Sequence, residues 1–230
     1  MKNIFKTIVF LMVIGLLTGC HDITTEGFTK ITHYPSFTMQ GDNPLIIELG
    51  ATFTDPGVIA MEGDDDITDK VNVSGSVNTN EVGFYSLTYS AINKDGFAGT
   101  ARRQVVVVNP APAFASAYWG ESEYGVRHYF NAPIVIKQKS DGAYQIDDLA
   151  GGFYFNGRYP GYEPNYDFHL EAVLKLESDN TITLGGLGSW YWDGADMSMT
   201  SGIFDPDTQT ITMELDFGGA PMYVTLIGVQ

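Results

Sequence analysis

The chain has 230 residues, of which 44% are hydrophobic, 13% aromatic and 17% charged. This composition is typical of globular proteins and unlike that of disordered chains, and the length suits two domains of modest size. The formal net charge is −16, so the surface is strongly acidic and repels phosphate groups. We therefore expect no nucleic-acid partner.

The N-terminus has the pattern of an export signal. Lys2 and Lys6 precede an apolar run over residues 8–17, which is too short to span a bilayer comfortably. The run ends in Leu17-Thr18-Gly19-Cys20, which resembles the lipobox of bacterial lipoproteins, and Cys20 is the only cysteine of the chain. The resemblance implies a signal peptide over residues 1–20, lipidation of Cys20 and anchoring to a membrane. The alternative is an ordinary cleaved signal with a chance cysteine.

Polar residues follow the cysteine. His21, Asp22 and Glu26 partly resemble the acidic stretch behind the lipidated cysteine of surface-exported Bacteroidetes lipoproteins. That resemblance implies the outer membrane, with the protein facing the extracellular side, while the lipobox alone leaves the leaflet open. Residues 21–41 are polar and rich in threonine, with no sustained periodicity, so we predict a tether there.

From residue 42 to residue 109 the sequence alternates short β-rich runs with turn residues. We predict strands over residues 45–49, 58–60, 71–77, 84–92 and 101–108. The alternation of Tyr85, Leu87, Tyr89 and Ala91 with small polar residues predicts one buried and one solvated face. The turn residues Asn93-Lys94-Asp95-Gly96 predict a hairpin between the last two strands.

Five motifs stand in order along this region. They are Gly50-Ala51-Thr52-Phe53-Thr54-Asp55-Pro56-Gly57-Val58, Asp66-Ile67-Thr68, Val73-Ser74-Gly75, Gly83-Phe84-Tyr85-Ser86-Leu87-Thr88-Tyr89 and Asn93-Lys94-Asp95-Gly96. Together they resemble the bacterial surface immunoglobulin-like (Ig-like) domains related to those of pesticidal crystal proteins. The resemblance implies an Ig-like β-sandwich over residues 42–109, with a role as a spacer or in adhesion.

Two prolines then interrupt the strand pattern, because proline cannot extend a central strand. We predict a linker over residues 110–113 and a second domain over residues 114–230. Its predicted strands cover residues 134–137, 143–146, 152–155, 168–176, 181–184, 202–204, 210–217 and 222–227. Short strands joined by hairpin turns, as at residues 177–180 and 205–208, predict a second antiparallel β-sandwich or a lipocalin-like β-barrel.

Two motifs of the second domain suggest a family as well. Gly151-Gly152-Phe153-Tyr154 and the run from Phe204 to Thr212 resemble the C-terminal domain found behind such Ig-like modules in Bacteroides lipoproteins. The resemblance implies an architecture and a location, and it brings no established activity. We find no convincing amphipathic helix after the signal peptide and expect the fold to be all-β.

Aromatic residues concentrate in the second domain, which holds all three tryptophans. Tryptophan and tyrosine have flat apolar faces with a polar edge, and these suit sugar rings whose hydroxyls bind nearby polar groups. If Trp190-Tyr191-Trp192 is a strand, both tryptophans lie on one face. The alternative is that these rings fill a core or fasten loops. The candidate ligand-binding residues are Trp119, Tyr159, Tyr162, Tyr166, Trp190, Trp192 and Asp193.

Metal-binding and catalytic motifs are scarce. Asp64, Asp66 and Asp69 are weak calcium candidates, since the spacing does not fit an EF-hand and a solvated acidic loop explains the run as well. The sequence contains no zinc-protease motif, nucleophile elbow or phosphate loop. We therefore expect no cofactor and no enzymatic activity.

The expected function is that of a membrane-anchored surface lipoprotein that binds an extracellular ligand, most simply a carbohydrate, through its second domain. The Ig-like domain serves as a spacer in this interpretation. One alternative is an assembly subunit or adhesin that contacts an outer-membrane protein partner through the same aromatic surface. Another is a glycoside-processing enzyme, for which Glu163 and Asp167 are among the available carboxylates.

Overall fold

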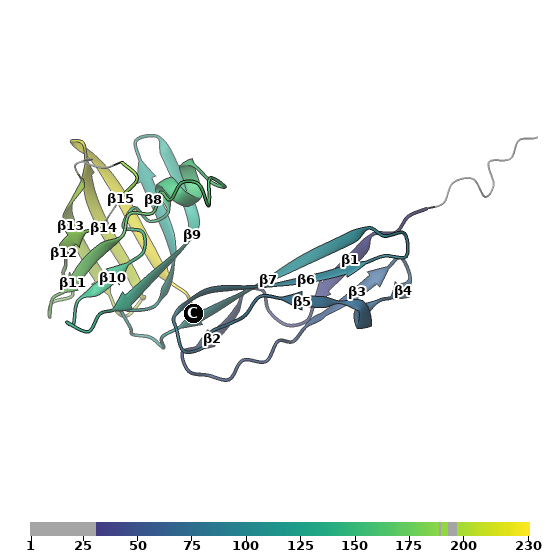
Figure 1. Cartoon of the computed structure of the whole chain (residues 1–230). Coiled ribbons are helices and arrows are strands. Elements are labelled where there is room, and N and C mark those ends of the chain that lie inside the picture. Colours follow the sequence, from purple (N-terminus) through teal and green to yellow (C-terminus); the bar gives the residue numbers. More distant parts are fainter. Residues whose placement is uncertain (1–30, 189, 193–196) are drawn as a thin grey trace, which may run out of the picture. The chain divides into compact units, whose positions relative to one another are not determined.

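The computed structural model describes residues 31–188, 190–192 and 197–230 (Figure 1). Residues 34–230 form one unit by their contacts. The expected signal peptide, the lipidated Cys20, residues 21–30 of the expected tether and Asp193 lie outside the described residues. In the described part of the chain, no helix is long and apolar enough to cross a membrane. The fold is nearly all-β, as predicted.

The first domain consists of two small sheets. One has the strand order β1-β3-β4, with bounds Pro35–Met39, Val58–Glu62 and Asp65–Asp66. The other has the order β2-β7-β6-β5, with bounds Leu45–Glu48, Ala98–Val108, Gly83–Ile92 and Asn72–Ser74. The pair of β2 and β7 is parallel, whereas β6 and β7 form the predicted antiparallel hairpin. A single turn of 3-10 helix, η1 (Thr68–Lys70), follows β4.

Alternation in β6 produces the core of this domain. Leu87, Tyr89 and Ala91 are buried, which confirms the predicted inward face. The predicted tether, however, is wrong for residues 35–39, which form β1 and pair with β3. Phe37 and Met39 of β1 pack against this core, and a run with only two inward apolar residues is too short to show periodicity in the sequence.

The second domain is one antiparallel sheet of eight strands in the order β12-β11-β10-β9-β8-β15-β14-β13. The strand bounds in that order are Ile182–Leu187, Ala172–Leu176, Tyr144–Ile146, Arg127–Gln138, Ala117–Tyr124, Ala220–Gly228, Thr210–Phe217 and Met197–Asp205. A bridge between Thr181 and Ile203 joins the two edges beside β12 and β13, so the sheet curls into a nearly closed barrel (Figure 1). Of the two predicted architectures, the barrel is therefore observed.

One predicted element of this domain differs from the structure, and one observed strand was not predicted. The segment predicted as a strand over residues 152–155 is wrong, because Phe153–Arg158 forms the short π-helix η2. Gly151 and Gly152 precede it with φ values of 62° and 82°, a backbone conformation that a strand does not contain. The other short helix, η1, lies in the first domain, and neither helix is long enough to show an amphipathic period, so the prediction of an all-β fold is confirmed. Strand β8 was not predicted.

The two domains share a small apolar core. Val106 and Val108 of β7 pack in one buried cluster with Ala117 of β8 and with Val229. Beside it the rings of Phe84 and Trp119 lie 4.9 Å apart. An ion pair between Lys137 and Glu81, 2.5 Å from Nζ to Oε1, adds a polar contact at the surface. These contacts explain why residues 34–230 form one unit.

Candidate functional site

The site is built on a buried turn between β10 and η2. Asp148 is fully buried, and its Oδ1 accepts hydrogen bonds from the N–H groups of Ala150 (3.0 Å) and Leu170 (3.2 Å). Its Oδ2 accepts one from the N–H of Gly152 (3.0 Å). The carbonyl oxygen of Gly152 in turn accepts from the N–H groups of Asn156 and Gly157 in η2. One carboxylate therefore fastens η2 and the segment before β11.

Gly152 has no room for a side chain. A Cβ atom built on it would lie 2.1 Å from the Cβ of Ala132 on β9. Gly157 is equally confined, because its Cβ would lie 2.3 Å from the ring of Tyr129. The glycines thus allow η2 to lie directly on β9, and this close packing fixes where the following aromatic loop begins.

A cluster of partly buried rings holds that loop against the barrel core. The ring of Trp192 stacks on Phe168 at 5.2 Å and lies 4.9 Å from Tyr154. Trp190 packs edge-on against Tyr154 at 5.3 Å and donates its Nε1–H to the carbonyl oxygen of Phe168 (3.2 Å). Both tryptophans therefore fasten loops onto the core, which is the alternative that the sequence left open.

Three tyrosines form the outer layer of this cluster, and we call Tyr162, Tyr166 and Tyr191 the tyrosine patch. Their exposed fractions are 50%, 45% and 50%. Tyr166 lies 6.2 Å from Tyr162 and 5.5 Å from Tyr191, measured between ring centroids. All three rings contact Phe168, which is buried. The patch is thus a set of half-exposed rings around one buried ring.

Polar groups flank the patch. The Nδ1 of His169 lies 2.7 Å from Oδ1 of Asp167, and the imidazole stacks on Phe155 with 3.5 Å between centroids. Burial acts to raise the pKa of Asp167, but the backbone N–H and the ring of His169 outweigh it and lower that pKa. Asp167 is therefore an exposed carboxylate that stays ionised near neutral pH and can accept hydrogen bonds from ligand hydroxyls.

The predicted site residues fall into distinct groups. Tyr162 and Tyr166 lie in the patch, and Tyr159 lies behind them, 4.9 Å from Phe168. Trp119 does not belong to the patch. It packs on Phe84, where the two domains share a core. Asp193 lies outside the described residues. The remaining predicted rings, Trp190 and Trp192, are the fasteners described above.

Sequence reasoning missed the residues that support the patch. Asp148 and Phe168 have no recognisable motif, and Tyr191 was not among the predicted binding residues. The available signal was Asp148 shortly before the pair Gly151-Gly152. The side chain of Asp148 accepts the N–H groups two and four residues further on. Aspartate side chains commonly accept such local N–H bonds.

The calcium candidates do not converge. Oδ1 of Asp66 accepts the N–H of Thr68 at 2.8 Å, which closes a local turn. Asp64 and Asp69 lie on the same loop, and within the described ranges no three His, Cys, Asp or Glu side chains gather where they could hold a metal ion. Asp64, Asp66 and Asp69 are all exposed.

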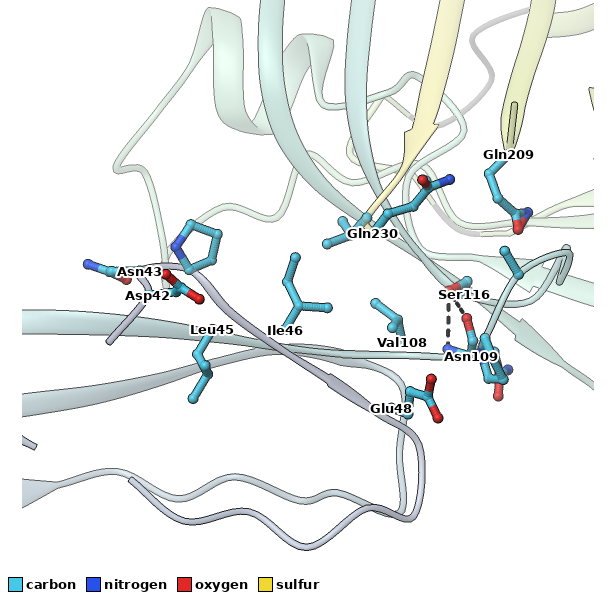
Figure 2. Close-up of a pocket in the computed structure, with 15 residues that line it drawn as sticks. Asp42, Asn43, Leu45, Ile46, Glu48, Val108, Asn109, Ser116, Gln209 and Gln230 are labelled. Carbon is cyan, nitrogen blue, oxygen red and sulfur yellow. Dashed lines mark hydrogen bonds between the residues drawn. The ribbon is translucent and has the colours of Figure 1, made fainter. Parts of the chain in front are cut away.

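A pocket of about 960 Å³ lies beside β2 and the end of β15 (Figure 2). Ile46 and Val108 form apolar walls, and Asp42, Glu48 and Gln230 are among its polar groups. Figure 2 shows Asn109 and Ser116 joined by hydrogen bonds at its rim. Its lining contains no aromatic ring, so it offers no stacking surface and the tyrosine patch is the better candidate.

Comparison with known proteins identifies both halves of the chain. Residues 37–107 match the family described as bacterial surface protein, Ig-like domain. Residues 109–227, more than half of the chain, match the BT2262-like C-terminal domain. The crystal structure of the lipoprotein BT2262 from Bacteroides thetaiotaomicron is 30% identical with a TM-score of 0.57, over 85% of this chain and 100% of that one.

This chain belongs to the BT2262-like family. No curated protein matches it. Two structures from Clostridium perfringens ZmpB are also similar. One contains CBM51-2 with GlcNAc and INT domains, at 13% identity and a TM-score of 0.29 over 84% of this chain and 43% of that one. The other contains the M60 catalytic domain with two CBM51 domains, at 14% identity and a TM-score of 0.30 over 85% of this chain and 21% of that one. These values carry no argument about the ligand.

Proposed function

We propose that this member of the BT2262-like family is a non-catalytic surface lipoprotein that binds carbohydrate through the tyrosine patch. The observation that carries the proposal is the arrangement of Tyr162, Tyr166 and Tyr191, half exposed around the buried ring of Phe168. Sugar rings stack on such faces, and the tyrosine hydroxyls with Asp167 supply hydrogen-bonding groups for sugar hydroxyls.

The packing of the tyrosines on a buried ring favours binding. Each tyrosine contacts Phe168, and the nearby Trp192 stacks on Phe168 as well. Ordering a free side chain on binding costs about 0.5–1.5 kcal/mol, so rings that are already held lose less freedom. The acidic surface adds a preference for neutral glycans, because anionic sugars are repelled by a net charge of −16.

Family membership supports a cell-envelope location. Within it, we propose that acyl chains on Cys20 anchor the protein in the outer membrane with its domains outside the cell. Two buried acyl chains suffice for stable anchoring, since each methylene contributes about 0.8 kcal/mol. The Ig-like domain then acts as the spacer between the anchor and the barrel.

The first test is a screen of neutral and anionic glycans with a soluble protein that starts after Cys20. The proposal predicts that neutral glycans bind and that binding perturbs the fluorescence of Trp192, whose ring lies 5.3 Å from that of Tyr191, or of Trp190, which packs on Trp192. A folded protein that binds no glycan, but retains an outer-membrane protein from native membranes through the patch, would favour an assembly or adhesion role. Turnover of a glycan would instead show an enzyme.

A further inference from the structure

The loop that carries Tyr162 and Tyr166 of the tyrosine patch is joined at both ends to one buried carboxylate. Gly152 immediately precedes η2 in the segment that leads to Tyr162, while Leu170 ends the segment that contains Tyr166 and Phe168. Both donate their N–H groups to Asp148, at 3.0 and 3.2 Å. A further bond from the N–H of Leu149 to the carbonyl oxygen of Leu170, 2.7 Å, lies beside it. No other side chain described in this turn bonds to both segments.

We infer that Asp148 positions the loop of Tyr162 and Tyr166 and that its ionisation state sets how firmly these two rings of the tyrosine patch are held for a ligand. The claim about the ligand rests on the function proposed above, whereas the claim about positioning rests on the contacts alone. Asp148 does not touch the patch, so it acts through the backbone of Gly152 and Leu170.

Protonation would change one bond in particular. The hydrogen-bond partners of both Asp148 oxygens are N–H donors, which suit an ionised carboxylate. Oδ1 accepts two of these bonds and Oδ2 only the one from Gly152, so a proton resides best on Oδ2. That oxygen is then a poor acceptor, and the first peptide of η2 loses its anchor. The bonds to Ala150 and Leu170 remain.

The surroundings of Asp148 place its protonation near neutral pH. Burial raises the pKa of Asp148 to about 7, while the charge of His169 and the N–H donors oppose the rise and the neighbouring Asp147 adds to it. Strands β8, β9 and β15 present Gly120, Ala132 and Val224 to the Gly151-Gly152 turn, and Glu121 of β8 contributes its backbone carbonyl oxygen. Asp147 and His169 are therefore the ionisable side chains whose titration must be separated from that of Asp148.

The test needs no ligand, because near-ultraviolet circular dichroism reports the packing of aromatic side chains. We expect the wild-type protein to change its near-ultraviolet spectrum between about pH 5.5 and 8, with a midpoint near 7 and an unchanged far-ultraviolet spectrum. Asp148→Asn should show the low-pH spectrum at every pH, since its amide offers a single acceptor oxygen to the N–H donors.

Two controls assign the transition. His169→Gln removes the imidazole and Asp147→Asn removes the adjacent carboxylate, which bonds to the N–H of Val135 instead. The inference predicts that the transition persists in both variants. A flat wild-type titration, or its loss in His169→Gln or Asp147→Asn, would overturn the inference. If Asp148→Asn does not fold, the titrations of the other three proteins still decide the matter.

Ligand binding is the second readout. If only the ionised form holds the patch, about one tenth of the protein is competent at pH 6, and the affinity for a bound glycan falls about tenfold. Asp148→Asn should bind equally weakly at pH 6 and pH 8. A spectral transition without any glycan binding would refute the proposed function and leave the positioning role standing. Glycan binding that is independent of pH would refute the role of Asp148 alone.

Discussion

Arg103 is a fully buried charge in the core of the Ig-like domain. Its Nε lies 3.3 Å from Oδ1 of Asp55 and donates to the hydroxyl oxygen of Tyr89 at 3.0 Å. Its terminal nitrogens donate to the carbonyl oxygens of Asp42, Gln40 and Gly57. Asp55 and Gly57 belong to one of the motifs that suggested the Ig-like domain. The carboxylate of Asp55 neutralises the guanidinium, and the carbonyl oxygen of Gly57 accepts one of its hydrogen bonds.

Replacing this residue tests that network. Arg103→Ala removes the guanidinium that neutralises Asp55 and donates to three carbonyl oxygens, so we expect the free energy of unfolding to fall by about 3–5 kcal/mol. The neighbouring Arg102 is exposed, and Arg102→Ala should change it by about 0.5 kcal/mol or less. Urea denaturation measures both variants. Equal losses would mean that the buried network contributes nothing specific.

Asp148 gives a pH dependence of stability of the opposite sign to that of an ion-paired carboxylate. Its pKa is raised from 3.8 to about 7 on folding, so the folded state binds more protons between those values. Its stabilising contribution is complete below pH 3.8 and is lost as the pH rises through about 7. The free energy of unfolding of the wild type, minus that of Asp148→Asn, should therefore decrease from about pH 4.5 to 7.5. A constant difference would contradict the raised pKa.

At the scale of elements, the alternation of apolar and polar residues predicted the strands that have one solvent-exposed face. It failed where the backbone conformation of glycines determines the local structure. Strand β6 shows its buried face directly in the sequence, and β14 (Thr210–Phe217) was predicted with its observed bounds. The turn into η2 was predicted as a strand, because Phe153 and Tyr154 favour strands by propensity. The left-handed conformations of Gly151 and Gly152 overrode that propensity.

Gly152 and Gly161 form a matched pair that measures the packing of η2. Both have positive φ values, 82° and 80°, but only Gly152 lies against another residue, while the space around Gly161 is open. Gly161→Ala should cost about 1–2 kcal/mol for the backbone conformation alone. Gly152→Ala should cost more, since Ala132 must move, and should also weaken glycan binding. Thermal unfolding compares the two, and equal shifts would show that η2 does not pack tightly on β9.

At the scale of the whole molecule, residues 34–230 form one compact unit because the domains share an apolar cluster. We expect a single cooperative unfolding transition in calorimetry of the soluble protein. Trp119→Ala removes the ring that packs on Phe84, so the single unfolding transition should split into two. Lys137→Ala removes only a half-exposed ion pair, worth about 0–1 kcal/mol, and should leave one transition. Two transitions in the wild type would contradict a shared core.

The candidate site could be predicted only in part. The sequence showed that aromatic residues concentrate in the second domain and that Tyr162 and Tyr166 lie in a glycine- and proline-rich loop, where exposure is common. It could not show that Trp190 and Trp192 point into the cluster, because no strand forms there. It also could not show that Trp119 packs on Phe84, since that contact depends on residues far apart in the chain.

The most direct test of the account compares glycan affinity between two kinds of tyrosine variant. Tyr162→Ala, Tyr166→Ala and Tyr191→Ala remove rings of the patch, whereas Tyr223→Ala removes a ring on β15 that is exposed to the same degree, 49%. Each patch variant should weaken binding of a glycan found in the screen by about 1–1.5 kcal/mol, roughly tenfold, while Tyr223→Ala should leave it unchanged. If the patch variants bind as well as the wild type, or if Tyr223→Ala is equally impaired, the patch is not the binding site.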